Sequence, residues 1–150
     1  MQKKFAPREI FEQLLEWSVI PTFDILFEYG DQGVIFLKRT ITPYENVWAL
    51  PGLRMYKGED IEETLQRIAK EELGLNIDGT QGIYLGQYTA KFKTEHDRQD
   101  LSTGYLFRLS GSEKLEYNKQ HFSNISISNK CPEPIGAMYQ YYFELYKQNS

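Results

Sequence analysis

Residues 48–75 constrain the fold of this chain more than any other segment, because they contain start and stop signals for one helix. Asp60 is a favoured N-cap residue, and Glu63 three positions later completes a capping box. Gly74 is typical of the position just after a helix ends. The segment therefore predicts a short strand, a glycine-containing loop and a helix, in that order.

The apolar face of this predicted helix includes a carboxylate. Ile61, Leu65 and Ile68 recur at helical spacing, and at about 100° per residue Glu72 falls between Ile61 and Leu65. A carboxylate on a buried face is costly unless a cation or several hydrogen-bond donors meet it. Glu72 is therefore a candidate metal ligand, and a salt bridge to a core-facing arginine is the alternative.

The spacing of charged residues in this segment resembles the Nudix box, G-x5-E-x7-R-E-U-x-E-E-x-G-U, in which U is aliphatic. The matching residues are Glu59, Arg67, Glu71, Glu72, Gly74 and Leu75. Two positions differ from the box: Leu53 replaces its first glycine, although Gly52 precedes it, and Ile68 replaces the glutamate after the arginine. In that family the box is a loop–helix–loop that holds divalent metal against a diphosphate, so Ile68 removes one metal-ligating carboxylate.

The resemblance extends over roughly residues 21–121 to one branch of the family, the GDP-mannose mannosyl hydrolases, in which a leucine follows the arginine. The residues that match this branch are Asp24, Lys38, Arg39, Thr40, Arg54, Tyr105, Gln120 and His121. Phe92 stands roughly where the branch has a tyrosine, and residues 91–102 and 122–130 differ from it in composition. These differences concern contacts with the sugar and the base.

The branch resemblance implies three ligands for a magnesium ion: the Gly52 carbonyl, the Glu72 carboxylate and the Gln120 side chain. Mg²⁺ prefers hard oxygen ligands and usually keeps several waters, so few protein ligands suffice. Mn²⁺ is the alternative ion. Glu71 lies one residue round the helix from Glu72, where it either binds a second ion or is solvated.

His121 is the candidate general base, because histidine is the side chain that ordinarily titrates near neutral pH. The other histidine, His96, lies in a charged segment without a neighbouring glutamine. Arg54 and Arg39 are the candidate cations for the diphosphate, since a positioned guanidinium stabilises the charge that develops on a departing phosphate. The alternative for both arginines is an ordinary surface position.

Four further residues complete the predicted site. Asp24 would accept hydrogen bonds from a base edge or a sugar hydroxyl, or would bond to neighbouring backbone. The Tyr105 phenol could reach the substrate, although a tyrosine in a strand most often serves packing. Glu59 and Arg67 are expected to pair and to brace the loop against the helix, which is a structural role.

The resemblance implies an Mg²⁺-dependent hydrolase of a nucleotide-diphosphate sugar, GDP-mannose or GDP-glucose. Because Ile68 replaces a box carboxylate and His121 is available, water would attack the anomeric carbon and release GDP and a sugar of inverted configuration. One alternative is a Nudix pyrophosphatase, which would release GMP and a sugar phosphate. A catalytically silent module that binds a nucleotide sugar is the second alternative.

The rest of the chain predicts an α+β fold. Residues 7–17 and 135–147 have helical patterns, residues 91–102 read as a charged surface loop, and the strands are expected at 22–29, 34–39, 47–50, 83–88, 101–109 and 122–127. The order predicts a Nudix-type α/β/α sandwich around a mixed β-sheet. Residues 1–20 would form a helical appendage that packs on the sheet or on a dimer mate, and residues 52–75 the box.

Composition bounds the kind of protein. With 150 residues, 41% of them hydrophobic, we expect a single domain, and a net charge of −4 without a basic stripe argues against nucleic-acid binding. No apolar run approaches the roughly 18 residues of a membrane span, and no signal-peptide core is present. The single cysteine, Cys131, excludes an internal disulfide. We therefore expect a cytoplasmic enzyme with a small-molecule substrate, and the branch resemblance and aromatic-rich termini imply a homodimer.

Overall fold

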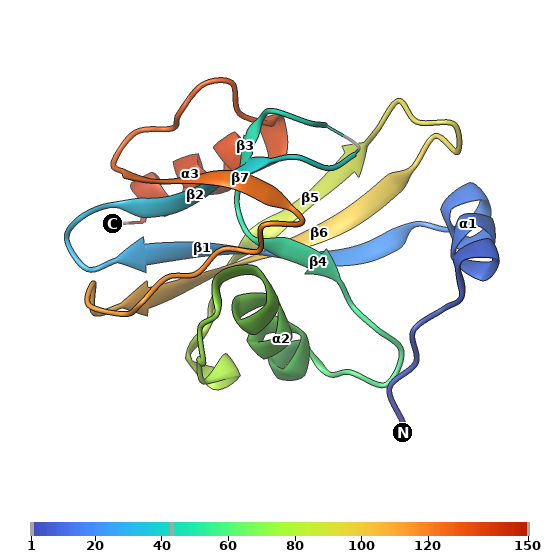
Figure 1. Cartoon of the computed structure of the whole chain (residues 1–150), viewed down its shortest axis with the longest axis horizontal. Coiled ribbons are helices and arrows are strands. Elements are labelled where there is room, and N and C mark those ends of the chain that lie inside the picture. The colour runs from blue at the N-terminus through green and yellow to red at the C-terminus, as the bar shows by residue number, and fades with distance from the viewer. Residues whose placement is uncertain (1, 43, 150) are drawn as a thin grey trace.

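The computed structural model describes residues 2–42 and 44–149, which contain three α-helices and a seven-stranded mixed sheet (Figure 1). In chain order the elements are α1 (Arg8–Trp17), β1 (Ile20–Tyr29), β2 (Val34–Arg39), β3 (Trp48–Ala49), β4 (Gly52–Arg54), α2 (Ile61–Leu73), the short helix η1 (Gly79–Gln81), β5 (Ile83–Lys91), β6 (Gln99–Leu109), β7 (Phe122–Ser128) and α3 (Ala137–Gln148). Helices α2 and α3 cover opposite faces of the sheet, which confirms the predicted α+β sandwich.

The sheet is organised around β1, which runs parallel to β6 along its whole length. On its other edge β1 is shared by two strands: β4 pairs with Thr22–Asp24, whereas β2 pairs only at Glu28, next to the turn that joins β1 and β2. Strands β3 and β7 both pair with β2, and β5 pairs with β6. This arrangement places the glycine loop of β4 directly beside Asp24 in the middle of the sheet.

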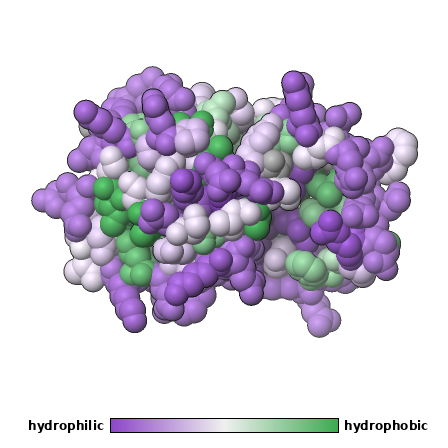
Figure 2. Space-filling view, turned by 45° about the horizontal axis from the view of Figure 1, so that its top comes forward, coloured by the Kyte–Doolittle hydropathy of each residue, from purple (hydrophilic) through white to green (hydrophobic). Residues whose placement is uncertain are grey.

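Alternation along β1 produces two hydrophobic cores. Phe23, Ile25 and Phe27 face α2, and Leu26 faces α3. Each fully buried side chain of this size stabilises the folded state by about 1.5–3 kcal/mol relative to an exposed one. The hydrophobic effect therefore holds both helices on the sheet. Outside the cores the face drawn in Figure 2 is mostly hydrophilic, with apolar side chains in separate patches.

Helix α2 confirms the predicted capping. The Asp60 carboxylate accepts from the Glu63 backbone N–H at 2.9 Å, the Glu63 carboxylate accepts from the Asp60 N–H, and Gly74 ends the helix with φ of +67°. Glu72 is buried as predicted, at 1% exposure, but Ile61 is 40% exposed. The prediction that Ile61 lies on the buried face is wrong, because α2 contacts the core only from its second turn onward.

The predicted surface loop at residues 91–102 is present but shorter than expected, because both of its ends are strand. Strand β5 continues to Lys91 and β6 begins at Gln99, so only residues 92–98 connect them. Asp100 and Ser102 are buried in spite of their polarity, because Asp100 pairs with Arg98 and Ser102 donates to Asp24. Backbone pairing of β6 with both β1 and β5 holds these polar residues in the sheet.

Helix α1 lies at one end of the molecule and is not packed into the core (Figure 1). None of its residues is buried, and Ile10, Leu14 and Trp17 are 51%, 42% and 82% exposed. The helix is therefore not packed on the sheet, and packing on a dimer mate stays a prediction. The helix contacts the rest of the chain through Phe11, which lies under a guanidinium, and Glu16. Among the described residues, no helix combines the length and apolar character needed to cross a membrane.

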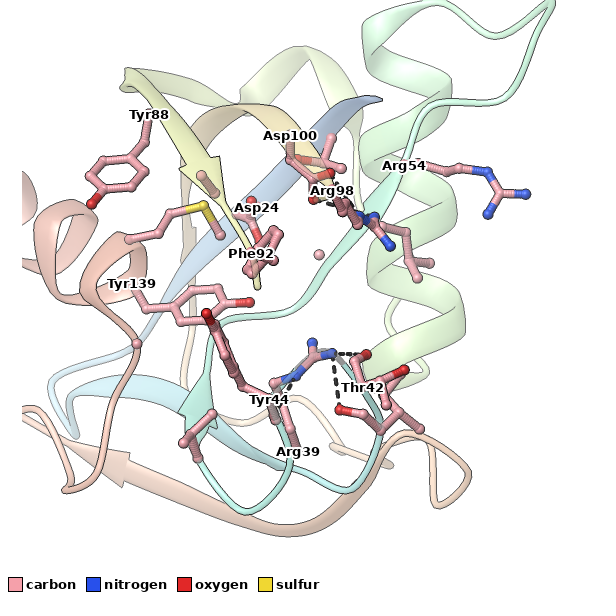
Figure 3. A pocket seen from close by; sticks show the side chains of 18 of the residues that line it. Asp24, Arg39, Thr42, Tyr44, Arg54, Tyr88, Phe92, Arg98, Asp100 and Tyr139 are labelled. Atoms are coloured by element: carbon pink, nitrogen blue, oxygen red, sulfur yellow. Dashed lines mark hydrogen bonds and ion pairs between the residues drawn. The ribbon is translucent and has the colours of Figure 1, made fainter. Parts of the chain in front are cut away.

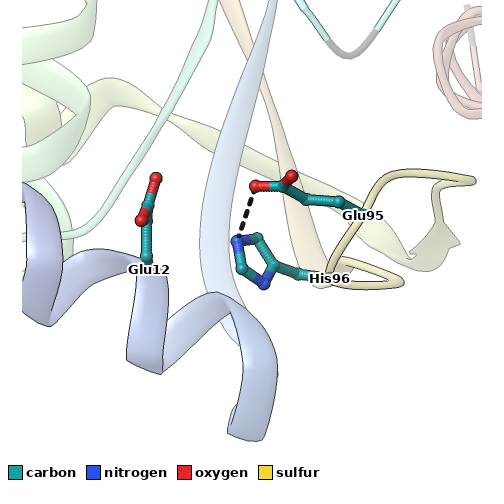
Figure 4. Close-up of side chains that lie close together, drawn as sticks. All are labelled: Glu12, Glu95 and His96. Atoms are coloured by element: carbon teal, nitrogen blue, oxygen red, sulfur yellow. Dashed lines mark ion pairs between the residues drawn. The ribbon is translucent and has the colours of Figure 1, made fainter.

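His96 connects α1 to the β5–β6 loop. Its Nδ1 lies 2.9 Å from the Glu16 carboxylate and its Nε2 lies 3.1 Å from the Glu95 carboxylate. Glu12 is also close, with one ligand-type atom from each of Glu12, Glu95 and His96 lying within 4.8 Å of the others (Figure 4). The hydrogen bond to Glu16 raises the pKa of His96.

We expect the attachment of α1 to weaken as pH rises. Because the folded-state pKa of His96 is raised, its charge stabilises the attachment fully below about pH 6.5, and this stabilisation is lost as pH rises through the raised pKa. Hydrogen exchange of α1 amides, corrected for intrinsic rates at about pH 6 and about pH 8.5, measures it. The His96→Asn variant should abolish the difference; an equal difference in the variant would contradict the role of His96.

Candidate active site

A cavity of about 960 Å³ opens between the end of β5, the N-terminus of α3 and the loop that follows β2 (Figure 3). Five of the predicted site residues line it: Asp24, Arg39, Gly52, Arg54 and His121. Its walls also include several residues that the sequence did not single out for the site, namely Tyr44, Tyr88, Arg98, Asp100 and Tyr139.

His121 and Glu72, 49 positions apart in sequence, form a hydrogen-bonded pair at the cavity. His121 Nδ1 lies 3.0 Å from Glu72 Oε2. Two backbone bonds hold the pair together, since the N–H groups of Glu116 and Asn118 donate at 3.0 Å to the carbonyls of Leu73 and Glu72. The loop before β7 is therefore fastened to the C-terminal end of α2.

The hydrogen bond to Glu72 bears on which nitrogen of His121 carries the proton. Burial raises the pKa of Glu72, and the hydrogen bond from His121 opposes that effect. When Glu72 is ionised and the imidazole is neutral, the carboxylate only accepts, so the proton between them lies on Nδ1 and Nε2 keeps a lone pair. A carboxylate that orients an imidazole in this way is a recurrent arrangement for a general base.

Gly52 and Asp24 lie side by side on paired strands. A β-carbon at position 52 would collide with the Asp24 carboxylate, so glycine is required there to leave the carboxylate room. The other Asp24 oxygen accepts from the Ser102 hydroxyl at 2.5 Å, and that hydroxyl is 2.8 Å from the phenol of Tyr142 on α3. This chain of hydroxyls holds Asp24 in the cavity floor.

Burial raises the pKa of Asp24 to about 7; the neighbouring Asp100 charge adds to this, and the bond from Ser102 opposes it. Burial also raises the pKa of Asp100, against the effect of Arg98. Asp24 is only 4% exposed, so little solvent compensates its charged form. The cavity floor therefore changes charge near neutral pH.

We expect Asp24→Asn to raise the free energy of unfolding by about 2–4 kcal/mol above about pH 7. Because the folded-state pKa is raised to about 7, wild-type stability falls as pH rises from about 4 through 7, and the variant does not undergo this loss. Urea unfolding at about pH 4 and about pH 8 measures the effect, with the exposed Asp31→Asn as control. An Asp24→Asn protein less stable than wild type at the higher pH would show that ionised Asp24 is fully compensated.

Arg39 lines the cavity and is held there by backbone carbonyls. Its guanidinium donates to the backbone carbonyls of Ile41, Thr42 and Tyr44 at 3.3, 2.6 and 3.1 Å. These bonds fix the side chain within the loop that follows β2, where Figure 3 shows it at the cavity. Arg39 is thus a fixed cation among the lining residues.

Arg54 points away from the other labelled residues of the cavity (Figure 3). Its guanidinium lies 3.8 Å from the ring centre of Phe11 on α1, and it also stacks near Phe5 and Tyr56. Cation–π contacts of this kind stabilise by about 0.5–2 kcal/mol. The structure therefore holds the predicted diphosphate cation in an aromatic cluster of the N-terminal segment and not beside His121.

Tyr105 and Gln120 are not brought to the cavity. The Tyr105 ring packs near Phe23 and Tyr84, on the α2 face of the sheet, as the packing alternative predicted. Gln120 is exposed, and its backbone N–H bonds to Asn118. Neither side chain is among the residues lining the cavity.

The remaining box residues form an ion-pair cluster. Arg67 binds Glu59 through two hydrogen bonds of 2.7 and 2.9 Å and donates to the Arg54 carbonyl at 2.6 Å, so the predicted pairing is present. Although burial acts in the opposite direction, these bonds lower the pKa of Glu59. Glu71 is 45% exposed and lies 3.5 Å from Arg67. The cluster joins the loop to α2.

Glu72 and Gly52 suit a hard divalent cation. Glu72 is a buried carboxylate whose described side-chain partner is one imidazole, and its second oxygen retains acceptor capacity. The Gly52 backbone lines the cavity. Oxygen donors of this kind are those that Mg²⁺ prefers. Gln120 would have to turn inward from its exposed position to join them.

Comparison with known proteins identifies related domains. Residues 20–127 match the NUDIX domain. The fold is similar to a MutT NUDIX hydrolase from Burkholderia pseudomallei, with 17% identity, a TM-score of 0.74, and 85% of this chain and 98% of that chain covered. It is also similar to the NUDIX domain of Shewanella oneidensis NrtR complexed with ADP ribose, with 15% identity, a TM-score of 0.69, and coverage of 96% and 99%. A MutT protein from Methanosarcina mazei Go1 has 16% identity and a TM-score of 0.72, with coverage of 88% and 96%.

Proposed function

Since this chain belongs to the Nudix domain family, we propose that it hydrolyses a nucleotide-diphosphate sugar, GDP-mannose or GDP-glucose, at the anomeric carbon. The observation that carries the proposal is the Glu72–His121 pair, which presents a histidine with a carboxylate behind it to a cavity that also contains Arg39. A small molecule with a charged diphosphate fits such a cavity.

In the proposed reaction His121 Nε2 removes a proton from water as the oxygen attacks the anomeric carbon. The bond between that carbon and the β-phosphate oxygen breaks, and the electron pair leaves with GDP. Glu72 stabilises the imidazolium that forms while it holds Nδ1. The attack comes from the face opposite the leaving group, so the sugar is released with inverted configuration.

The leaving group is stabilised by charge. Arg39, held by three backbone carbonyls, places a guanidinium in the cavity where negative charge develops on GDP. Glu72 and Gly52 would hold Mg²⁺, which when bound neutralises part of the diphosphate charge. With Arg39 and Mg²⁺ sharing the charge of the leaving group, Glu72 is the one box carboxylate that the proposed reaction requires.

The surroundings of Glu72 favour attack on carbon over attack on phosphorus. Ile68, which replaces a box glutamate, is completely buried, and Glu71 is turned toward solvent and Arg67. A carboxylate cluster that would activate water beside phosphorus is therefore incomplete. Glu71 could still recruit a second ion, which is the structural feature that would favour the pyrophosphatase alternative.

Hydrolysis in H₂¹⁸O tests the proposal. We expect ¹⁸O in the C1 hydroxyl of the released sugar and none in either phosphate, measured by mass spectrometry and ³¹P NMR. Label in GMP or in sugar phosphate would show instead that the enzyme is a pyrophosphatase. If neither pair of products forms with Mg²⁺ or Mn²⁺, the chain is a binding module.

A further inference from the structure

A second arginine, Arg98, lines the cavity directly before β6 begins. Arg98 lies beside Asp100, which pairs with Ile20, whereas Asp24 and Gly52 lie four residues farther along β1. At ~3.3 Å per residue this is about 13 Å along the sheet. The backbone at Asp100 therefore lies at a different level of the sheet from the backbone at Gly52.

The guanidinium of Arg98 is held in one orientation. Its Nε and Nη2 bind the Asp100 carboxylate at 2.8 and 3.3 Å, and its backbone N–H donates to the Thr94 hydroxyl at 3.1 Å. The Asp100 side chain is 9% exposed and that of Arg98 is 24% exposed. Pairing through Nε and Nη2 leaves the Nη1 amino group without a hydrogen-bond partner among the described residues, so it can donate to a ligand.

We propose that Arg98 selects guanine as the base of the substrate, an inference that rests on the proposed function. Guanine presents two adjacent acceptors, O6 and N7, to a guanidinium, whereas adenine presents the N6 amino group beside N7 and would place donor against donor. Tyr44 and Phe92, whose ring centres are 5.5 Å apart, lie in the same part of the lining and offer flat surfaces beside a planar base. Asp100 acts through Arg98 and is a positioning residue.

The charge distribution supports this assignment. Asp100 already neutralises Arg98, so Arg98 is a better donor to a neutral base edge than a counter-ion for an anionic diphosphate. Among the described residues, the hydrogen bonds of Arg39 go to backbone carbonyls and not to a carboxylate, so Arg39 is the better counter-ion for the diphosphate. The two arginines thus divide base and phosphate recognition.

The experiment compares kcat/KM for GDP-glucose and ADP-glucose, which differ only in the base. We expect the wild type to prefer GDP-glucose, and Arg98→Lys and Arg98→Gln to lower the GDP/ADP ratio about 10- to 100-fold. Asp100→Asn should lower the ratio less, because it loosens the guanidinium without removing it. Arg108→Lys, at the far end of β6, is the matched control because its side chain is exposed, and it should keep the ratio. A ratio unchanged in both Arg98 variants would overturn the proposal.

Calorimetric binding of GDP and ADP in the presence of Mg²⁺ separates base selection from the reaction. Tighter binding of GDP, lost in folded Arg98→Lys protein, would support the role of Arg98 even if no NDP-glucose is cleaved, in which case only the proposed reaction fails. Equal affinity of the wild type for GDP and ADP would overturn base selection, although hydrolysis at the anomeric carbon could still hold. Thermal melts of both Arg98 variants identify any that do not fold, and the folded one carries the test.

Discussion

Replacing Glu72 with glutamine is expected to lower kcat about 10³-fold or more while the fold stays intact. The substitution keeps the shape of a side chain that is 1% exposed, but it removes the charge that would bind a divalent ion and stabilise the His121 imidazolium. Because burial disfavours the charged form of Glu72, the neutral amide should not destabilise the metal-free protein. Activity normalised to folded protein, together with a thermal melt, measures both effects.

Magnesium supplies an independent readout for Glu72. Mg²⁺ that binds only the folded protein should raise the melting temperature of the wild type by mass action, and this rise should be lost in Glu72→Gln. Glu62→Gln, on the exposed face of the same helix, is the matched control. If Glu72→Gln melts at a much lower temperature without Mg²⁺ but retains activity per folded molecule, then Glu72 has a structural role only.

Replacing His121 with glutamine is expected to lower kcat by about 10²- to 10⁴-fold, the usual range for a lost general base. Glutamine can still hydrogen-bond to Glu72, so the contact that positions the loop before β7 is retained while proton transfer is lost. Activity that falls on the acidic side of the wild-type profile, where protonation would remove the base, should become independent of pH there. A kcat–pH profile of the folded variant measures this.

Two comparisons test whether His121 and Glu72 act as one unit. His96→Gln removes the other histidine, which binds α1 and not the cavity, and should leave kcat near the wild-type value. The double variant Glu72→Gln/His121→Gln should lose much less activity than the product of the two single losses, because each single change already disables the pair. Fully multiplicative losses, or an unchanged pH profile in His121→Gln, would remove the pair from the mechanism.

Local patterns in the sequence determined the elements of the fold. The helix over residues 61–73 could be predicted from Asp60, Glu63 and Gly74, because capping depends on side chains within one turn of the helix end. Strands β1, β2 and β6 could be predicted from alternating or continuous apolar residues for the same local reason. The burial of Glu72 followed from helical periodicity alone, and so did its need for a partner.

Local patterns failed where burial depended on a partner distant in sequence. Residues 99–102 looked too polar for a sheet, yet Asp100 and Ser102 are buried since Arg98 and Asp24 satisfy them. A signal was present: the alternation of Tyr105, Phe107 and Leu109, extended backward, assigns even-numbered residues to the opposite face of β6. The sequence therefore predicted on which face of β6 Asp100 and Ser102 lie. Their burial could be predicted only with knowledge of the side chains that bind them.

The direction of each long side chain was decided only by the tertiary structure. Arg54 stacks on Phe11 of a helix that the sequence predicted without its position, and Gln120 is exposed although His121 beside it reaches the cavity. Residue type and spacing set which chemistry is available, whereas packing of several elements sets where a flexible arginine or glutamine points.

The sequence by itself determined the type of fold, the helix that carries Glu72 and the residue types available for hydrolysis. Only the tertiary structure decided that Glu72 meets His121, which is 49 positions away in sequence. Backbone bonds from the loop before β7 to the end of α2 bring the two side chains together. No local signal encodes such a contact; it arises when β2 and β7 pair and when β1 is shared with β4. The same packing brings Arg98 into the cavity. Because β6 runs parallel to β1, the segment where β6 begins, with Arg98 and Asp100, lies in the cavity lining.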